Sequence, residues 1–550
     1  MAIPAFDEII EQNDQTAARR EHLDELRALV GNAYPNKFER SGLSGGEDTI
    51  TAILEHGPVA DIAAEMADVR SKLGPGERPP AEVKDALNEK LKGLGKVRIA
   101  GRLTTPPRGN FVHLTDGMGR LQIYCKKGEF ALVKNDGKRT LDEENGWTAW
   151  QLIDHGDFVG VEGYLFVTNT GEVSVHVEKL QFLAKAMLPM PDKMHGIEDA
   201  EIKQRQRYVD LIGSTLAVEH DGLTTRQVFE VRAQVISSLR RFLEDHGYIE
   251  VETPMLTPKA TGAAATPFET HHNALDIKLY ARIAPELYLK RLVVGGFEKV
   301  YELNRNFRNE GISYKHNPEF TMLEFYCAYM DVEGMMTFCE ELLRQSVQKA
   351  TGGLTVEYEG KTIDFSKFER ISMRDSIAQY APNVEIDDSN IVTAFDEHVE
   401  SNLIQPTFIV DFPKSISPLS KASPENSAVA ERFELFINGM EVANGFSELN
   451  DPKEHYERFV DQMAERERGD EEAMVLDEDY IRALSYGMPP AAGIGIGVDR
   501  FVMLLTNKHS IRDVILFPHM RPERRSEAAS GQSPDAAPTQ HPFRPLRRRF

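Results

Sequence analysis

The chain has 550 residues, of which 41% are hydrophobic and 27% are charged. This length and composition predict a globular protein of two or more domains, each large enough to bury its own core. No stretch approaches the ~18 consecutive apolar residues of a membrane span, and the first residues lack the basic and apolar regions of a signal peptide. We therefore expect a cytoplasmic protein with no membrane association.

The net charge of −23 excludes a protein that coats nucleic acid non-specifically, because phosphate binding requires lysine and arginine at the contact surface. The charge is uneven, however: residues 96–139 contain ten basic and three acidic residues, a local charge of +7. This basic segment is compatible with an RNA contact confined to one domain, although a solvated surface rich in loops would carry the same charge. The three cysteines are isolated, which favours buried thiols over zinc or redox chemistry.

Residues 1–95 are charged and have apolar residues such as Leu23, Leu26 and Val30 at helical spacing, so they predict a helical N-terminal extension. From 96 to 185 the pattern changes to short alternating segments separated by glycine and aspartate turns. These segments are VRIAGRL, NFVHLTD, LQIYCKK, DFVGVEGYLFV and VSVHVEKLQFL. Five such strands predict a small barrel, and basic residues together with strand aromatics favour an OB-fold that binds nucleic acid.

A second domain is predicted from 200 to 522. Its first long helix has a stripe of apolar residues from Val228 to Leu243 and ends at Gly247, before the predicted strand YIEVETP. Further strands are predicted at KVYELNR, FTMLEFY, PTFIVDF and AAGIGIGV. The tail from 523 to 550, rich in Ser, Pro, Ala and Arg, is predicted to be disordered.

Three segments of this domain carry residues suited to chemistry. FRNEGISYKHNPEFTMLE packs charged residues around a turn between two strands, which would be costly to bury without a charged ligand. ERFELFINGMEVANGFSEL supplies oxygen ligands that suit Mg²⁺ bridged to phosphates, although a lone pair of carboxylates is more often a solvated face. In PPAAGIGIGVDR the evenly spaced glycines do not form a dinucleotide loop, but they let a nucleotide or a helix approach the backbone.

Taken together, these segments resemble the class II lysyl-tRNA synthetase family over roughly residues 96–522. GYIEVETPML resembles the first class motif, FEKVYELNRNFRNEGISYKHNPEFTMLEF the second and PPAAGIGIGVDRFVMLLTN the third. The resemblance implies an α+β fold, with an N-terminal OB-fold barrel for the anticodon and a catalytic domain built on an antiparallel sheet flanked by helices. It also implies a homodimer with the first motif at the interface.

The implied reaction is a two-step acyl transfer, in which lysine and ATP form lysyl-adenylate and the lysyl group then passes to tRNA(Lys). The resemblance assigns the amino-acid carboxylate and the α-phosphate to Arg308, the adenine stack to Phe320 and the γ-phosphate to Arg500. Glu310 and His316 match other positions of the ATP site. Glu434 and Glu441 match the magnesium ligands of the family. The residues that match its lysine pocket are Gly262, Glu286, Glu324, Tyr326, Asn444 and Glu448. Those that match its anticodon contacts are Phe111, Gln122 and Glu172.

Three alternatives were weighed against this interpretation. An aspartyl or asparaginyl enzyme of the same class would share the fold, but an aspartate site needs cationic side chains, whereas the matched pocket is acidic. A protein-lysyltransferase would lack the barrel, and a non-catalytic RNA-binding relative would not need the intact arginines and carboxylates. The chain departs from the family at Thr266, where the family has a basic residue, and in the segments 41–95 and 523–550, which have no counterpart.

Overall fold

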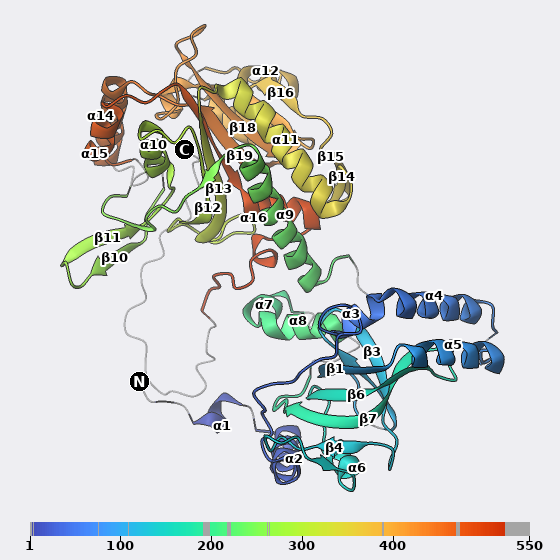
Figure 1. The fold of residues 1–550 in the computed structure, drawn as a ribbon. Helices are drawn as coiled ribbons and strands as arrows, with labels where there is room; N and C mark the ends of the chain where they lie inside the picture. The colour runs from blue at the N-terminus through green and yellow to red at the C-terminus, as the bar shows by residue number, and fades with distance from the viewer. Residues whose placement is uncertain are drawn as a thin grey trace. The chain divides into compact units, whose positions relative to one another are not determined.

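The computed structural model describes most of the chain, and the described residues form two compact units that divide between residues 221 and 222 (Figure 1). The described residues are 3, 5–10, 12–74, 76–107, 109–190, 199–216, 222–260, 262, 265–387, 390–468 and 474–522. The tail from 523 to 550, predicted to be disordered, lies outside them. Within the described residues, no helix is both long and apolar enough to cross a membrane.

The first unit contains a closed five-stranded barrel, which confirms the predicted OB-fold. Its strands are β1 (Lys96–Leu103), β2 (Phe111–Thr115), β3 (Arg120–Tyr124), β6 (Phe158–Val167) and β7 (Val173–Ala184). Neighbouring strands pair in the order β3-β2-β1-β6-β7, and the parallel pairing of β3 with β7 closes the barrel. The sequence analysis did not predict β4 (Ala131–Val133), β5 (Leu141–Asp142) or α6 (Gly146–Gln151), which follow β3.

Helices surround this barrel and share its core. Helices of the first unit are α1 (Phe6–Ile9), α2 (Asp14–Val30), α3 (Ile50–Glu55), α4 (Gly57–Ser71), α5 (Ala81–Gly93), α7 (Ala200–Arg205) and α8 (Arg207–Leu216). Leu26 of α2, Ile53 of α3 and Leu91 of α5 are fully buried in the same hydrophobic cluster as the barrel residues Ile99 and Leu180. The N-terminal helices and the barrel are therefore stabilised by one continuous core.

The second unit is built on an eight-stranded sheet with the order β16-β17-β18-β19-β20-β13-β12-β8. The strands are β8 (Ile249–Glu250), β12 (Lys299–Phe307), β13 (Glu319–Ala328), β16 (Glu369–Ser372), β17 (Thr407–Pro413), β18 (Val429–Ile437), β19 (Met440–Ser447) and β20 (Ala491–Gly497). The six central strands are antiparallel, as predicted, whereas β8 and β16 pair in parallel at the two edges.

The strand predicted at 248–254 is much shorter in the structure. Only Ile249 and Glu250 pair with β12. Further along, Thr253 donates its hydroxyl to the side chain of Glu302 at 2.7 Å, and Pro254 has no N–H to donate to a ladder. The alternating pattern predicted a full strand because alternation does not specify over how many residues the neighbouring strand can pair.

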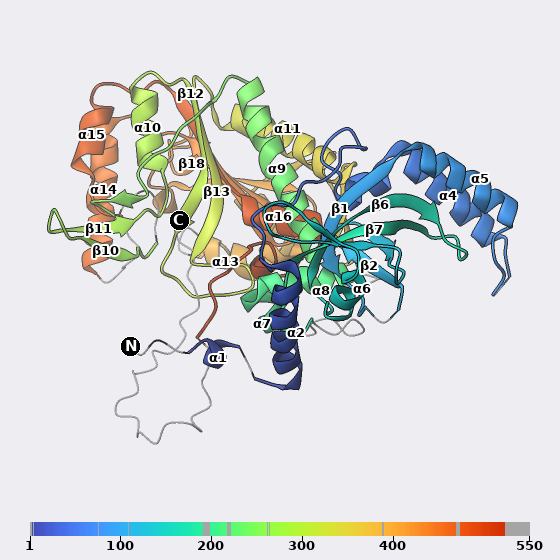
Figure 2. The same cartoon turned by 60° about the horizontal axis from the view of Figure 1, so that its bottom comes forward.

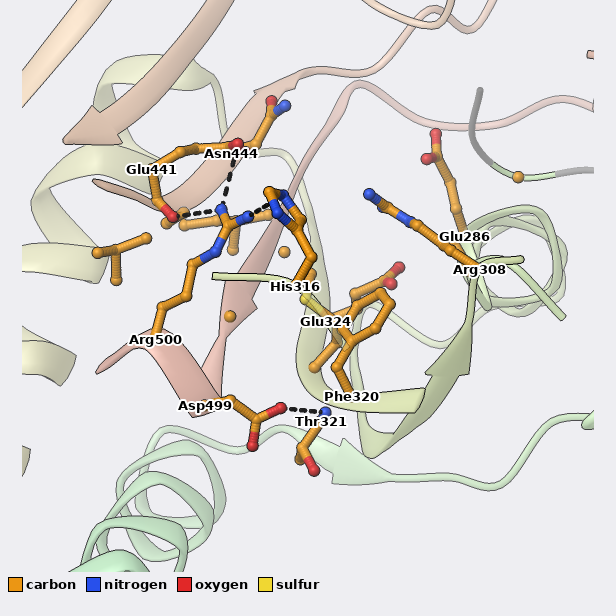
Figure 3. Close-up of a pocket in the computed structure, with 18 of the residues that line it drawn as sticks. Glu286, Arg308, His316, Phe320, Thr321, Glu324, Glu441, Asn444, Asp499 and Arg500 are labelled. Carbon is orange, nitrogen blue, oxygen red and sulfur yellow. Dashed lines mark hydrogen bonds and ion pairs between the residues drawn. The ribbon is translucent and has the colours of Figure 1, made fainter. Parts of the chain in front are cut away.

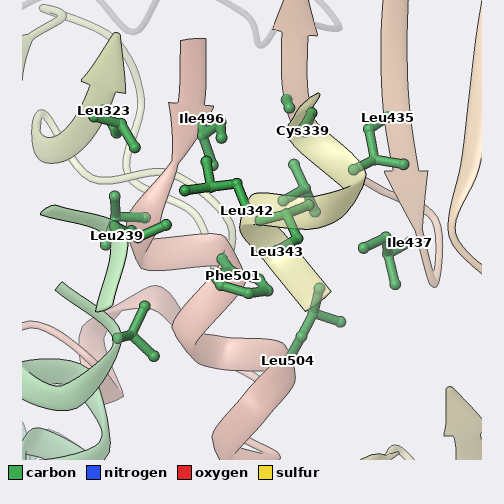
Figure 4. Close-up of a cluster of buried hydrophobic side chains, with 14 of the residues drawn as sticks. Leu239, Leu323, Cys339, Leu342, Leu343, Leu435, Ile437, Ile496, Phe501 and Leu504 are labelled. Carbon is green, nitrogen blue, oxygen red and sulfur yellow. The ribbon is translucent and has the colours of Figure 1, made fainter. Parts of the chain in front are cut away.

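Helices cover both faces of this sheet (Figures 1 and 2). Those on one face are α9 (Thr225–Asp245), α11 (Val332–Thr351) and α16 (Val498–Thr506), and those on the other are α10 (Glu286–Val294), α14 (Pro452–Glu467) and α15 (Glu478–Leu484). The predicted first helix, α9, begins at a capping box formed by Thr224 and Gln227 and ends before Gly247, whose positive φ of 79° favours glycine. Figure 4 shows aliphatic side chains of α9, α11 and α16 against the sheet.

Smaller elements complete the second unit. They are the strands β9 (Leu256–Thr257), β10 (Glu269–His272), β11 (Ile277–Ala281), β14 (Thr355–Tyr358) and β15 (Lys361–Asp364), the helices α12 (Met373–Tyr380) and α13 (Ile391–His398), and the 3₁₀ turns Glu400–Asn402, Lys414–Ile416 and Ile511–Asp513.

Alternation along β13 and β20 separates a hydrophobic face from a polar one. In β13, Leu323 and Phe325 lie in the core beneath the helices, while Glu324 between them points to the opposite face. In β20 the core positions are Ile494 and Ile496, and the glycines that alternate with them lie on the same face as Glu324. The sheet therefore has one face without bulky side chains at its centre.

Candidate active site

A cavity of about 580 Å³ opens on this glycine-lined face, within the range of roughly 300 to 1,000 Å³ found for small-molecule sites. Most of the residues singled out in the sequence line it: Gly262, Glu286, Arg308, Glu310, His316, Phe320, Glu324, Tyr326, Glu441, Asn444 and Arg500. Glu434 and Glu448 do not line it: they are buried, with 4% and 1% of their surfaces exposed. Gly493, Gly495 and Gly497 also line the cavity, so the evenly spaced glycines leave space for a ligand.

Two arginines, Arg308 and Arg500, line the cavity. Arg308 follows β12, and its backbone N–H donates to the carbonyl of Pro318 at 2.9 Å, which closes the turn between β12 and β13. Its guanidinium lies 5.2 Å from the centre of the Phe320 ring. The buried Nε of Arg308 has no hydrogen-bond partner among the described residues, so this donor can serve a bound anion.

Arg500 is held by contacts from β19 and from the segment between β12 and β13. Its Nη1 donates to the carbonyl of Glu441 at 2.8 Å, and its Nη2 lies 3.1 Å from Nε2 of His316 (Figure 3). The preceding residue, Asp499, accepts hydrogen bonds from the backbone N–H of Thr321 and from Arg232, at 2.7 and 2.6 Å. These contacts fix the first turn of α16 against β13, so the Arg500 side chain starts from a rigid position.

The cavity is also lined by the carboxyl groups of Glu286 and Glu324. Glu324, with 5% of its surface exposed, accepts a hydrogen bond from the side chain of Asn306 at 3.2 Å. Burial, with a smaller contribution from the carboxylate of Glu286, raises the pKa of Glu324 to about 8. Burial and the same carboxylates raise the pKa of Tyr326 well above its ordinary value, so its phenol stays protonated. This cluster fits a cationic ligand, which would offset the charge of the carboxylates.

Two cations beside these carboxylates were missed in the sequence. Lys290 on α10 lies 2.5 Å from carboxylate oxygens of both Glu286 and Glu448, and Arg432 on β18 lies 2.5 Å from Glu434. Both could have been found locally, because residues four apart share a helix face and residues two apart share a strand face. The approach of Lys290 to Glu448 has no such local signal.

The predicted magnesium ligands suit a hard cation by the chemistry of their donors. Glu434 and Glu441 offer carboxylate oxygens, and the buried Oδ1 of Asn444, close to Glu434, has no hydrogen-bond partner among the described residues. In the described part of the chain, no three or more His, Cys, Asp or Glu residues are arranged so that they could hold a metal ion by themselves. Two protein carboxylates completed by phosphate oxygens are the usual way in which Mg²⁺ is held with a nucleotide, so the donors fit.

The three residues predicted to read the anticodon lie on the barrel of the first unit. Phe111 is 47% exposed, and its ring centre lies 4.5 Å from that of Tyr124. The Gln122 side chain donates to Glu172 at 2.9 Å, and the ring of His113, which the sequence analysis missed, lies 2.8 Å from the other oxygen of Glu172. An exposed ring beside oriented polar groups is the arrangement that stacks and reads a nucleic-acid base.

Comparisons with known proteins agree with both units. Residues 199–521 match the profile of the family described as tRNA synthetases class II (D, K and N), and residues 97–183 match that of an OB-fold nucleic acid binding domain. The chain belongs to the class II tRNA synthetases (D, K and N).

Curated relatives match almost end to end. A lysine–tRNA ligase of Coxiella burnetii (strain Dugway 5J108-111) is 46% identical over 545 residues, covering 94% of this chain and 99% of the relative. The lysine–tRNA ligases of Aeromonas hydrophila and Pectobacterium carotovorum are 45% and 43% identical, covering 95% and 94% of this chain and 99% and 98% of the relatives.

This class II synthetase departs from the sequence pattern of its family at Thr266, which lies outside the cavity lining. The backbone carbonyl of Thr266 accepts a hydrogen bond from the N–H of Asn309 at 2.8 Å. The position therefore supports the turn that carries Arg308 through its backbone, a contact that any side chain allows.

The raised pKa of Glu324 predicts how stability depends on pH. The unfolded chain releases this proton near the ordinary value of 4.5, whereas the folded protein keeps it up to about 8. Between these values the folded state binds more protons, so this group makes the free energy of unfolding decrease as the pH rises. Glu324→Gln removes that contribution, and its stability relative to the wild type should increase from about pH 5 to about pH 8.

Urea denaturation without substrates, repeated across this pH range, measures the difference. The matched control is Glu357→Gln on β14, an exposed position whose effect should not vary with pH. A constant difference for Glu324→Gln would show that Glu324 is ionised in the folded protein at these pH values.

Proposed function

We propose that this protein is a lysine–tRNA ligase, which joins lysine to ATP as lysyl-adenylate and transfers the lysyl group to the 3′ end of tRNA(Lys). The observation that carries the proposal is the acidic cluster of Glu286, Glu324 and Glu448, two of them buried, beside a cavity that Arg308 and Arg500 also line. The curated relatives named as lysine–tRNA ligases support it. The reaction uses cytoplasmic ATP and tRNA, so the proposal places the enzyme there.

The acidic cluster accounts for the choice of amino acid. Lysine carries two ammonium groups, and burying either without an opposite charge costs several kcal/mol. Glu286 and Glu324, with the carbonyl of Gly262, would bind the α-ammonium, while Glu448, Tyr326 and Asn444 would bind the side-chain ammonium. The same field repels aspartate, because the carboxylates there outnumber the one ammonium of Lys290, which is already paired with them.

Arg308 and Arg500 account for the activation of the amino acid. The lysine carboxylate attacks the α-phosphorus of ATP, and the bond to the β-phosphate breaks to release pyrophosphate. Arg308 would stabilise the charge at the α-phosphorus while Phe320 stacks on adenine. Arg500 would hold the γ-phosphate, with Glu310 and His316 completing the nucleotide site. A terminal ribose hydroxyl of tRNA then attacks the carbonyl of the adenylate, and AMP leaves. Alignment and charge stabilisation suffice, without a covalent enzyme intermediate.

Magnesium is the cofactor that these residues suit. Glu434 and Glu441 would hold it together with phosphate oxygens of ATP, and the ion would neutralise part of the phosphate charge. Arg432 lies 2.5 Å from the carboxylate of Glu434 and would orient it.

The lysine-dependent exchange of pyrophosphate into ATP tests the proposal, with each standard amino acid assayed in turn. Exchange supported by lysine alone is the expected result, and exchange supported by aspartate or asparagine instead would overturn it. Arg308→Ala should reduce the lysine-dependent rate by about 100-fold or more, the usual effect of losing one charge-stabilising donor. The matched control is Arg305→Ala, which removes a neighbouring arginine that pairs with Glu319 outside the cavity and should leave the rate unchanged.

Phe111 should contribute to tRNA recognition and not to lysine activation. Stacking on one base is worth roughly 1 to 3 kcal/mol, so Phe111→Ala should lower kcat/KM for tRNA in aminoacylation by about 5- to 150-fold. Pyrophosphate exchange without tRNA should be unchanged. Leu141→Ala, at a similarly exposed apolar position of the same unit, is the control for loss of apolar surface. An equal decrease in exchange would assign Phe111 a structural role.

We also propose that the enzyme is a homodimer through its first motif. Ile249, Met255 and Leu256 of this motif are 53%, 37% and 51% exposed, and β8 is an edge strand of the sheet. A second copy of the same chain would cover these side chains. Leu256→Glu should shift the sedimentation coefficient from that of a dimer to that of a monomer, whereas Tyr486→Glu, at an 86% exposed position on another segment, should not. A wild-type monomer at micromolar concentration would contradict the proposal.

A further inference from the structure

A lysine of the protein itself lies inside the acidic cluster. Lys290 is fully buried, and its Nζ is 2.5 Å from one oxygen of Glu286 and 2.5 Å from one oxygen of Glu448. The Phe446 ring lies 5.2 Å from the same ammonium. Lys290 does not line the cavity, so it contacts these carboxylates from behind. A fully buried ammonium is stable only when carboxylates neutralise it, so this geometry ties α10 to the segment after β19.

Lys290 leaves Glu448 with one oxygen for a ligand. Neither buried oxygen of Glu448 has a hydrogen-bond partner among the described residues, but Oε2 forms the ion pair with the Lys290 ammonium, whereas no ion pair is found for Oε1 there. Oε1 lies against Gly493, where an added Cβ would come within 2.4 Å of it. Because Gly493 lines the cavity, the unpartnered oxygen is presented toward the place where a substrate binds.

Lys290 also sets the charge of the cluster. When the two ammonium groups of the substrate bind and ionise the cluster, Glu286, Glu324, Glu448 and the one ammonium of Lys290 sum to −2, which balances the +2 of those two groups. Without a bound cation, burial raises the pKa of Glu324 and keeps it protonated up to about pH 8. The neighbouring His455 does not alter this sum, because burial and the Lys290 ammonium lower its pKa to about 3. Without Lys290 the sum would be −3, and one carboxylate would remain unpaired when the substrate binds.

We propose that Lys290 is a positioning residue for amino-acid selection: its ammonium orients Glu448 toward the substrate and matches the charge of the pocket to a diammonium ligand. The inference rests on the proposed function, since it takes lysine as the amino acid. Arg282 and Glu302, which lie nearby, do not share this role, because they pair with each other at 2.6 Å and add no net charge.

The alternative is that Lys290 only stabilises the fold. A double-mutant cycle in the full-length protein separates the two, with the KM for lysine and the KM for ATP measured in pyrophosphate exchange for Lys290→Met, Glu448→Gln and the double variant. Lys290→Met should raise the KM for lysine by about tenfold or more and change the KM for ATP less than about twofold. Lys349→Met, at an exposed lysine on α11, is the control and should change neither.

The double variant gives the decisive comparison. Removing one ammonium and one carboxylate returns the cluster to −2, so its KM for lysine should be no higher than that of Glu448→Gln alone. The proposal would be overturned if the increase in the KM for lysine of the double variant equalled the product of the increases of the two single variants. It would also be overturned if Lys290→Met left the KM for lysine unchanged. If Lys290→Met does not fold, as judged by circular dichroism, the comparison of Glu448→Gln with the double variant still decides, because neither keeps an unpaired buried cation.

Rejection of the role of Lys290 can be distinguished from rejection of the proposed function. If the wild-type protein supports exchange with another amino acid and not with lysine, the proposed function fails before any variant is compared. If the wild type uses lysine and Lys290→Met has an unchanged KM for lysine, only the role of Lys290 is rejected.

Discussion

The arrangement of the second unit depends on the alternation of side chains along β13 and β20. Leu323, Phe325 and Ile494 point to one face and pack under α9, α11 and α16, which stabilises the sheet. The residues between them point to the other face, where Glu324 carries a carboxyl group and Gly493 carries no side chain. A rigid hydrophobic layer therefore lies directly behind the cavity, and residues on its strands keep fixed positions without support from a ligand.

Buried ion pairs position the loops around this cavity. Arg232 pairs with Asp499, Arg282 with Glu302 and Arg432 with Glu434, and each pair is almost entirely removed from water. Desolvation offsets much of the attraction in such pairs, so they are weak evidence for stability. Their geometry is specific, however, because a misplaced partner would leave an uncompensated charge. The oxygens left without partners, on Glu448 and Asn444, mark the places where a ligand completes the network.

The first unit carries the surface that we propose to recognise a nucleic-acid base. Phe111 is exposed on a barrel strand although it is large and apolar, and the ring of Tyr124 beneath it keeps it in place. Glu172 is oriented by His113 and Gln122, so its carboxylate does not need to reorganise when a base binds. The N-terminal helices contribute to the same core as the barrel strands, so this unit is larger than a bare OB-fold.

The sequence by itself determined the barrel strands, the central strands of the catalytic sheet and the helix before Gly247, because their periodicity and end signals are local. Resemblance to a family identified the residues that gather at the cavity. Only the tertiary structure decided that β8 pairs over two residues, that the sheet edges are parallel, and that Lys290 lies between Glu286 and Glu448. Glu286 and Glu448 are far apart in the chain, and periodicity specifies which face a residue occupies but not which distant residue it meets.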